Sequence, residues 1–315
     1  MRSYTLIAPA KVNLYLEIIG ARPDGYHELA MILQSIDLAD YIRLHSNGTD
    51  AIRIHCNHPL VPLDKSNIAY RAAILMAEQF PTAFAQYGGV EIDIDKRIPV
   101  AAGLAGGSTN AAAVLVGLDL MWNLGLTQSE LQELAAQLGS DVPFCIAGGT
   151  AIATGRGEKL SPLPDLDHLY LVLAKYRSLQ VSTAWAYTTY KQQFESSYKY
   201  DRQSWEAHSA NLKSGALVNA IAHKDSAKIG QYLYNDLEKV VLPAHTQVLR
   251  LREAFARTSE ILGTMMSGSG PTVFALTKSL AQAEQVKNEV ASAISDPDLD
   301  FWLAQFIPTG IRVAS

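Results

Sequence analysis

The sequence predicts an α+β protein built from two domains. A chain of 315 residues suggests two domains on the usual size of a folding unit, each with enough apolar residues for its own core. Segments with the period of half-buried strands and segments at helical spacing both recur along the chain. Two prolines and little periodic signal over 160–167 mark the expected boundary, so we predict domains over 1–162 and 163–315.

Composition and charge argue against several classes of partner. The net charge of -5, with charged residues scattered along the chain, gives no basic surface for nucleic acid. The two cysteines, Cys56 and Cys145, make no disulfide framework, and we expect both to be buried apolar residues in a reducing compartment. The apolar N-terminus is interrupted by Lys11, Asn13 and Glu17 and is too short to span a membrane. We therefore expect a cytoplasmic protein without a membrane or nucleic-acid partner.

The first strand is predicted over 14–18, where alternate apolar residues share one face. Pro9 restricts the entering backbone, so Lys11 is expected at the mouth of this strand, within reach of a site. The turn sequence RPDGYHEL follows and places Tyr26 and His27 directly after its glycine. From the residues alone, these two side chains fit a surface rim as well as a binding role.

A β-hairpin is predicted from two short alternating runs, 41–46 and 51–56, that flank the turn residues 47–50. His55 and His58 lie near its end. A histidine pair without a neighbouring carboxylate cluster is more typical of a surface than of a metal site, so we expect no metal ligands there.

The centre of the chain, DKRIPVAAGLAGGSTNAAA at 95–113, combines a strand exit, a glycine-rich turn and a helix start. Three glycines allow the backbone to approach a ligand closely, and the predicted N-terminal residues of the helix are Ser108, Thr109 and Asn110. A helix start offers unpaired N–H groups to an anion, which predicts a polyphosphate site. The turn matches neither the P-loop nor the dinucleotide motif, and a glycine turn that only packs a helix on a sheet remains an alternative.

Helix caps are predicted on both sides of this turn. A helix over 66–80 has Ser66 or Asn67 as its N-cap, and another begins at the capping-box pair Thr127 and Glu130. Gly139 ends that second helix. Asp141 follows in an apolar stretch, where an aspartate serves either as a local cap or as a catalytic carboxylate, and the residues alone favour the cap.

The second half shows more helix than strand. A helix begins near 181–187 with Ser182 or Thr183 as cap, and strand-like segments flank a second glycine turn, SGSGPT, at 267–272. Further helical patterns lie over 211–222, 225–234, 244–257 and 280–294. Residues 191–208 are polar and aromatic without a clear period, and we interpret them as a surface insertion.

Three ordered motifs resemble the GHMP small-molecule kinases. They are PAKVNLYL at 9–16, PVAAGLAGGSTNAAA at 99–113 and MSGSGPTVFA at 266–275. Within that superfamily, the chain is similar to the branch that acts on a cytidine-diphosphate-linked methylerythritol in the non-mevalonate isoprenoid pathway. The motifs that carry this second similarity are RPDGYHEL at 22–29, GSDVPF at 139–144 and VSTAWAY at 181–187.

The resemblance implies an enzyme that uses ATP to phosphorylate the 2-hydroxyl of the methylerythritol unit. It implies the two-domain GHMP kinase fold, with an N-terminal ribosomal-protein-S5-like domain, a C-terminal ferredoxin-like domain and the site between them. Its partners would be small-molecule substrates, with no obligatory protein partner. A divalent metal, Mg²⁺, is expected with ATP, although the sequence shows no dedicated cage, as suits an ion held largely by phosphates and water.

The resemblance also implies roles for individual residues. The catalytic pair would be Lys11 and Asp141, and the substrate contacts would be Asn13, Tyr26, His27, Thr183 and Tyr187. The ATP site would contain the continuous loop Pro99, Val100, Ala101, Ala102, Gly103, Leu104, Ala105, Gly106, Gly107, Ser108 and Thr109, with Asn67 and Lys96 near the adenosine. Relatives often carry more glycine where this chain has Ala101, Ala102 and Ala105, which predicts a slightly tighter loop.

Elementary chemistry agrees with this assignment. Phosphoryl transfer depends mainly on positioning and charge stabilisation, with a carboxylate to accept the proton of the acceptor hydroxyl. An aspartate in an apolar setting tends to become neutral, whereas a lysine within a few ångströms favours its ionised form, so Asp141 and Lys11 make sense as one unit. Another GHMP kinase with a different alcohol, and a catalytically silent ligand sensor, remain open at this stage.

Overall fold

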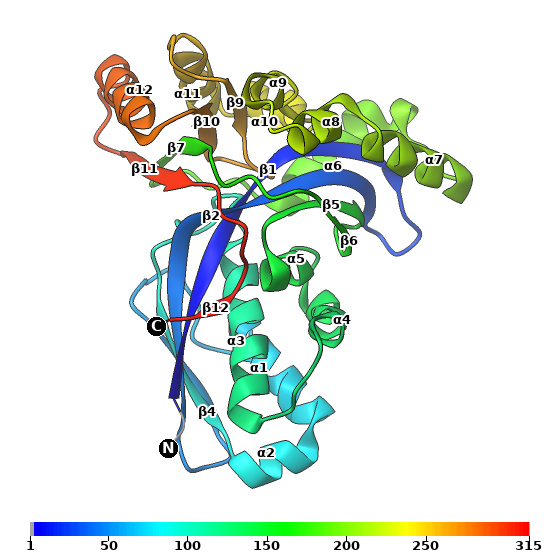
Figure 1. Ribbon diagram of the computed structural model, residues 1–315, viewed down its shortest axis with the longest axis vertical. Helices are drawn as coiled ribbons and strands as arrows, with labels where there is room; N and C mark the ends of the chain where they lie inside the picture. The colour runs from blue at the N-terminus through cyan, green and yellow to red at the C-terminus, as the bar shows by residue number, and fades with distance from the viewer. Residues whose placement is uncertain (1–2, 315) are drawn as a thin grey trace.

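The computed structural model describes residues 3–314, which contain a larger mixed sheet and a smaller antiparallel sheet (Figure 1). The strands are β1 (Ser3–Ala21), β2 (His27–Ser46), β3 (Ile52–Cys56), β4 (Val90–Asp95), β5 (Thr150–Gly155), β6 (Lys159–Pro162), β7 (Tyr170–Tyr176), β8 (Tyr234–Asn235), β9 (Gly263–Met266), β10 (Val273–Thr277), β11 (Leu299–Gln305) and β12 (Arg312–Val313). Residues 1, 2 and 315, the ends of the two predicted domains, lie outside the described part.

The helices complete an α+β fold, which confirms the predicted class. They are α1 (Ile68–Gln79), α2 (Pro81–Tyr87), α3 (Gly106–Trp122), α4 (Gln128–Leu138), α5 (Val142–Ala147), α6 (Thr183–Phe194), α7 (Arg202–Lys213), α8 (Ala216–Ala222), α9 (Ser226–Gln231), α10 (Glu238–Ala244), α11 (Thr246–Ala256) and α12 (Leu280–Ala293), with a short 3-10 helix η1 (Glu195–Ser197). Within residues 3–314, no helix has the length and apolar character that a bilayer crossing requires.

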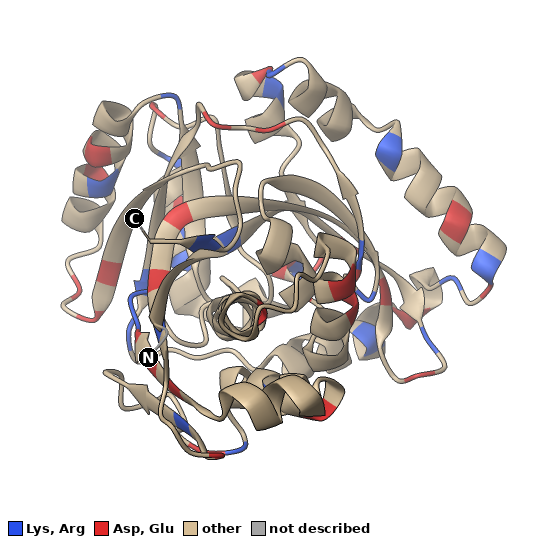
Figure 2. Cartoon of the chain, turned by 60° about the horizontal axis from the view of Figure 1, so that its bottom comes forward, with Lys and Arg blue, Asp and Glu red and all other residues tan. Residues whose placement is uncertain are grey.

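Two long antiparallel strands, β1 and β2, organise the molecule. The larger sheet has the order β12-β1-β2-β4-β3, with β5 and β8 paired to these long strands, and the smaller sheet has the order β11-β7-β10-β9. In Figure 1 the long strands run from the part that carries α1 to α5 into the part that carries α6 to α12 and the smaller sheet. Acidic and basic residues are interspersed on the same elements in both parts (Figure 2).

The hydrophobic clusters show how the two parts are joined. One cluster fills the space between β4 and helices α1 and α3. Another combines Leu16 and Leu33 of the long strands with Val172 and Ala275 of the smaller sheet, all of them nearly inaccessible to solvent. Because the same two strands contribute residues to both clusters, burial of apolar surface holds the two parts together.

The predicted hairpin is wrong, because its two strands do not pair with each other. β4 lies between them, antiparallel to β2 and parallel to β3. Val90, Ile92 and Ile94 are all buried in β4, which gives this strand a larger apolar face to cover than a short hairpin strand has. The predicted turn does form, with Gly48 at a positive φ of 68°. The chain then passes β4 and enters β3, which lies two positions from β2 in the sheet.

The predicted start of the first strand is also wrong. β1 begins at Ser3, so Lys11 lies in the middle of a 19-residue strand and not at its mouth. Proline has no backbone N–H to donate to a neighbouring strand. The strand tolerates Pro9 because the register with β2 shifts between Pro9 and Ala10, and this irregularity interrupts the regular hydrogen-bond ladder there. Lys11 is consequently held by β-sheet pairing on a rigid strand.

Most helix caps follow the prediction. Asn67 caps α1, Ser182 caps α6, and Thr127 and Glu130 form the full capping box of α4, which ends at Gly139. α3 differs, since it begins at Gly106, two residues before Ser108, and Ala105 at its N-cap provides no side-chain hydrogen bond. The helix therefore presents its first N–H groups without a side-chain cap, as an anion site requires.

Two smaller expectations are corrected as well. Cys145 is buried, but Cys56 is only partly so, because it ends β3 near the edge of the sheet. Residues 191–208 are not an irregular insertion, since they complete α6, form η1 and begin α7. Tyr198 in this segment is buried among the aromatic residues of one core.

Candidate active site

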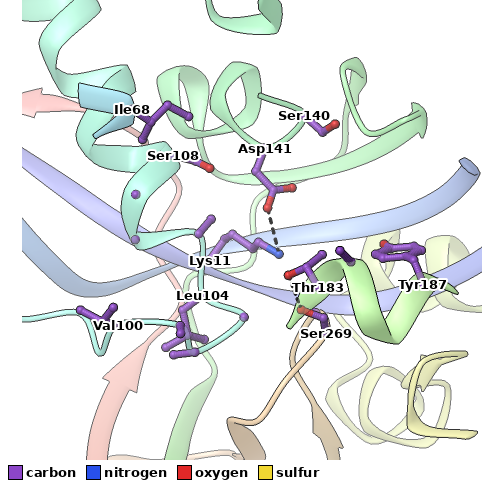
Figure 3. Close-up of a pocket in the computed structure, with 18 of the residues that line it drawn as sticks. Lys11, Ile68, Val100, Leu104, Ser108, Ser140, Asp141, Thr183, Tyr187 and Ser269 are labelled. Carbon is purple, nitrogen blue, oxygen red and sulfur yellow. Dashed lines mark hydrogen bonds and ion pairs between the residues drawn. The ribbon is translucent and has the colours of Figure 1, made fainter. Parts of the chain in front are cut away.

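A single cavity of about 850 Å³ brings the predicted site residues together from distant parts of the sequence (Figure 3). It is bounded by the middle of β1, the start of β2, the loop before α3, the first residue before α5 and the first turn of α6. Of the predicted residues, it is lined by Lys11, Asn13, Tyr26, His27, Asn67, Lys96, Asp141, Thr183, Tyr187 and the whole run from Pro99 to Ser108.

Thr109 is the predicted residue that does not line this cavity. It occupies the fourth position of α3, where its side chain turns away from the loop, and it is fully buried. Its predicted contact with ATP therefore stays a prediction, although α3 begins two residues before the predicted helix start.

Lys11 and Asp141 face each other at the centre of the cavity (Figure 3). The Lys11 Nζ atom lies 3.5 Å from the Asp141 Oδ2 atom and donates a hydrogen bond of 2.8 Å to Asn13 Oδ1. Lys11 and Asn13 are buried, whereas the Asp141 side chain is 30% exposed toward the cavity. The three side chains form a fixed polar group with one carboxylate open to a ligand.

Asp141 does not cap α5, which is the role that the residues alone favoured. Asp141 stands at the N-cap position of α5, yet its φ and ψ of -85° and -15° are helical and its side chain makes no cap hydrogen bond. A carboxylate that capped the helix would turn toward the N–H groups of the first turn. The Asp141 carboxylate instead points to Lys11, so the pair and not the helix determines its orientation.

The glycine loop approaches the second glycine turn. Gly103 has a positive φ of 72°, and a Cβ added there would collide with the carbonyl oxygen of Ser267, whose hydroxyl donates a 3.1 Å hydrogen bond to the Gly103 carbonyl. This contact joins the loop before α3 to the turn between β9 and β10. Two of the three family motifs therefore meet at one wall of the cavity.

Two of the three alanines in the loop have unusual backbone conformations. Ala101 and Ala105 have positive φ values of 52° and 57°, in the left-handed region that costs an L-residue about 1–2 kcal/mol. The surrounding contacts impose this geometry on the loop despite its cost. Strain of this kind is typical of ligand-binding turns.

Lys96 and Asn67 are engaged inside the protein. The Lys96 ammonium pairs with the fully buried Asp40, which also accepts hydrogen bonds from the backbone N–H groups of Arg97 and Ile98 at 2.7 and 2.8 Å. Both polar ends of the Asn67 amide are occupied, by the N–H of Ala69 and the carbonyl of Pro62. Both residues line the cavity, but their polar groups form hydrogen bonds and an ion pair within the protein that stabilise the cavity wall.

Aromatic residues gather at the opposite end of the cavity. The rings of His27 and Tyr187 lie 5.1 Å apart with 33° between their planes, and Tyr26 is half-exposed beside them. Burial lowers the pKa of the His27 imidazole below its usual value, and the Lys191 ammonium lowers it further. Burial raises the pKa of the Tyr187 hydroxyl, so both rings are neutral at pH 7.

The His27 Nε2 atom is buried and has no hydrogen-bond partner within residues 3–314. An unsatisfied buried polar atom costs about 1–3 kcal/mol, so the His27 side chain, which lines the cavity, carries a polar nitrogen that the protein itself leaves without a partner. Thr183 completes this end, with its Oγ1 atom 2.8 Å from Ser269 Oγ of the second glycine turn (Figure 3).

Two regions, one in each half of the chain, match models of one family. Residues 67–149 match the family described as GHMP kinases N terminal domain, and residues 217–296 match GHMP kinases C terminal. A 4-diphosphocytidyl-2-C-methyl-D-erythritol kinase from Nostoc punctiforme is 68% identical to this chain, over 100% of it and 99% of the relative. The chain belongs to the 4-diphosphocytidyl-2-C-methyl-D-erythritol kinase family. It is thus a GHMP kinase, as the motifs predicted, and GHMP kinases use ATP as phosphate donor.

Other members of this kinase family agree over the same length. The enzyme of that name from a Synechocystis strain is 57% identical, over 99% of both chains. A crystal structure of a 4-(cytidine 5'-diphospho)-2C-methyl-D-erythritol kinase is 30% identical and superposes with a TM-score of 0.73, over 96% of this chain and 98% of the other. A homoserine kinase from Cytophaga hutchinsonii, 18% identical with a TM-score of 0.74 over 100% of this chain and 98% of the other, shares the fold.

Several cavity residues were missed by sequence reasoning. Gly268 and Ser269 come from SGSGPT, a turn that the sequence marked and that the third family motif contains, so this signal was present but unused. Arg156 and Ser140 also line the cavity, and the Arg156 guanidinium lies 5.0 Å from the centre of the Tyr26 ring. Arg156 has no local signal, because only the pairing of β5 with β2 brings it to the site.

Proposed function

We propose that this kinase transfers the γ-phosphoryl group of ATP to the 2-hydroxyl of 4-diphosphocytidyl-2-C-methyl-D-erythritol. The observation that carries this proposal is the placement of the Lys11–Asp141 pair between two differently built ends of one cavity. One end is a strained glycine loop at an uncapped helix start, which suits the phosphates of ATP. The other end is a group of neutral aromatic rings, which suits a nucleobase.

In this proposal, Asp141 is the general base. Its carboxylate accepts the proton of the substrate hydroxyl as the hydroxyl oxygen forms a bond to the γ-phosphorus atom. The bond from that phosphorus to the β,γ-bridging oxygen breaks, and ADP leaves with the electron pair. Lys11 orients the carboxylate through their 3.5 Å ion pair and is itself fixed at the centre of the site by its hydrogen bond to Asn13.

Backbone N–H groups would bind the phosphates. The first turn of α3 offers them from Gly106, Gly107 and Ser108, and none is used by a side-chain cap. The positive end of the helix dipole adds to their attraction for an anion. Because the loop is joined to the second glycine turn through Gly103 and Ser267, both turns would move together on binding.

The residues present fit a magnesium ion that ATP brings with it. Within residues 3–314, no three histidine, cysteine or acidic side chains lie close enough to hold an ion by themselves. Asp141 supplies the carboxylate among the described residues that line the cavity, and Ser108 supplies a hydroxyl in the first turn of α3; Mg²⁺ commonly keeps waters and phosphate oxygens as its other ligands. When bound, the ion would neutralise charge on the phosphates.

Selection of the base is assigned to His27. Stacking against Tyr26 and Tyr187 tolerates any base, so a preference for cytosine needs a contact with the edge of the ring. We expect the cytidine substrate to be preferred strongly over its uridine counterpart. Tyr187→Ala should raise KM for both substrates alike, whereas His27→Ala should narrow the gap between them.

Competition kinetics with the two substrates tests this assignment and the proposed function together. Equal use of both by the wild-type enzyme, or phosphorylation of methylerythritol phosphate without a nucleotide, would mean that the base pocket does not exist. Another alcohol kinase of the GHMP fold would then be the better interpretation.

The pH dependence of substrate binding should follow His27. The neutral imidazole has one acceptor nitrogen for a base amino group, and the protonated ring has none. Because burial holds the His27 pKa below its ordinary value of about 6.5, KM for the cytidine substrate should stay flat from pH 8 to about 6.5 and rise at lower pH. His27→Gln should remove that rise. The same pH profile in wild type and H27Q would contradict the assignment.

The remaining expectations belong to the same proposal. The chain would act in the cytoplasm on small molecules, without nucleic acid, a membrane or an obligatory protein partner. Its two free cysteines and its interspersed surface charges support this setting (Figure 2). A division into domains 1–162 and 163–315 is likewise proposed, with the reaction taking place where the two meet.

A further inference from the structure

We propose that Tyr198 is a positioning residue that sets the orientation of His27 and so contributes to the choice of base. The inference rests on the function proposed above, and it concerns a segment, 195–200, to which the family motifs assign no role. Tyr198 does not line the cavity. It stands behind His27, where it would act through that ring and not by contact with a substrate.

The segment is fixed to the strand that leads to His27. The N–H of Lys199 donates a 2.8 Å hydrogen bond to the Ile19 carbonyl of β1, and the Lys199 carbonyl accepts one of 2.7 Å from the Trp205 indole. A Cβ at Gly20 would collide with that same carbonyl, so this close approach requires glycine at position 20. Tyr198 is therefore placed by backbone contacts with β1.

The same end of β1 carries the partner of His27. Ala21, the last residue of β1, is paired across the sheet with His27, the first residue of β2. Lys199 docks on β1 two residues before Ala21. The end of β1 thus contacts both segments through its backbone, and these backbone contacts determine the position of Tyr198 relative to His27.

Ring packing is what orients the His27 side chain. Its ring packs against two tyrosines, with centroids 5.1 Å from Tyr187 at 33° and 5.8 Å from Tyr198 at 87°. No hydrogen bond within the described residues holds the buried Nε2 atom. The χ2 torsion of histidine has a broad range of accessible angles, so the His27 ring would rotate if no neighbouring side chain packed against it. Tyr198 supplies the edge-to-face wall, a geometry that aromatic pairs favour.

Tyr198 itself is well supported. It is 6% exposed and belongs to the hydrophobic cluster that includes Tyr190, whose ring is stacked with that of Tyr198 at a centroid distance of 6.3 Å. The Tyr198 hydroxyl has no hydrogen-bond partner in the described part of the chain. The ring, and not the hydroxyl, is therefore the part that acts on His27.

The test is the ratio of kcat/KM for the cytidine substrate to kcat/KM for the uridine substrate. Tyr198→Met keeps a long apolar side chain but removes the ring, and we expect the ratio to fall about fivefold, through a higher KM for the cytidine substrate. KM for ATP should stay within twofold. Tyr198→Phe keeps the ring and should hold the ratio within twofold of wild type. Leu280→Ala alters an exposed side chain at the start of α12 and should leave the ratio unchanged.

Several results would overturn the inference. An unchanged ratio in Y198M, a ratio lost equally in Y198F, or parallel rises in KM for ATP and for the cytidine substrate would show that Tyr198 only supports the fold. If Y198M does not fold, Y198L carries the same expectation. Failure of the proposed function looks different, because the wild-type enzyme itself would then show no preference between the two substrates.

Discussion

Replacing Asp141 with asparagine is expected to lower kcat by about 100-fold or more while ATP still binds. The amide keeps the size of the carboxylate and can still accept a hydrogen bond from Lys11, but it cannot take the proton of the substrate hydroxyl. Since the Asp141 side chain caps no helix, loss of its charge should not unravel α5. Steady-state kinetics with a separate ATP titration measures both effects, and Asp93→Asn on the exposed face of β4 is the matched control.

Substitution of Lys11 provides a second test of the Lys11–Asp141 pair. Lys11→Met should also lose rate, and the double variant D141N/K11M should be far less impaired than the product of the two single effects. Their side chains lie 3.5 Å apart, close enough for strong coupling. Near-normal kcat in D141N, or strictly multiplicative effects in the double variant, would mean that the two residues do not act together on the reaction.

Replacing Gly107 with alanine is expected to raise KM for ATP about tenfold without loss of stability. Gly107 lies in the first turn of α3, and an added Cβ would meet only the Ile68 side chain, at an ordinary 3.5 Å. Alanine favours a helix over glycine by up to about 1 kcal/mol, so Tm should stay level or rise. A phosphate seated on the N–H groups of this turn would be displaced by the same methyl group.

Gly107 is a sharper test than the neighbouring glycines. A Cβ at Gly106 would lie 2.7 Å from the Lys96 Nζ atom, and one at Gly103 would strike the Ser267 backbone, so either change would disturb the protein itself. Nucleotide titration beside a thermal melt separates the two readouts. Unchanged ATP affinity in Gly107→Ala would mean that the glycine turn packs the helix against the sheet and does not bind phosphate.

Local chemistry in the sequence was enough to predict the helix caps and the glycine turn, whereas the roles of the individual site residues came from the family resemblance. The caps at Asn67, Thr127 and Ser182 depend on residues a few positions apart, and the structure has them as predicted. The glycine loop was recognised for the same reason, since its turn and its helix are adjacent in the chain. The start of α3 was missed because the left-handed conformation of Ala105, which begins the helix early, is imposed by tertiary contacts.

Features that depend on distant pairing could not be predicted. The expected hairpin failed because β4, almost 40 residues further on, competes for the same strand edge with a more apolar face. Arg156 and Tyr198 reach the site only through the pairing of β5 with β2 and the docking of 199 on β1. The pairing of Lys96 with Asp40 was hidden for the same reason, because 56 residues separate them.

In the proposed reaction, a carboxylate and a lysine fixed between a phosphate loop and a base pocket direct phosphoryl transfer from ATP to one hydroxyl of a cytidine-linked alcohol. The most direct measurement incubates the purified enzyme with ATP and a panel of alcohols, and follows ADP release and the phosphorus NMR spectrum of the product. We predict stoichiometric ADP and a new phosphate monoester on the 2-hydroxyl of the cytidine diphosphate methylerythritol alone, with neither formed by D141N. A new monoester on a different alcohol, or ADP released without any monoester, would contradict the account.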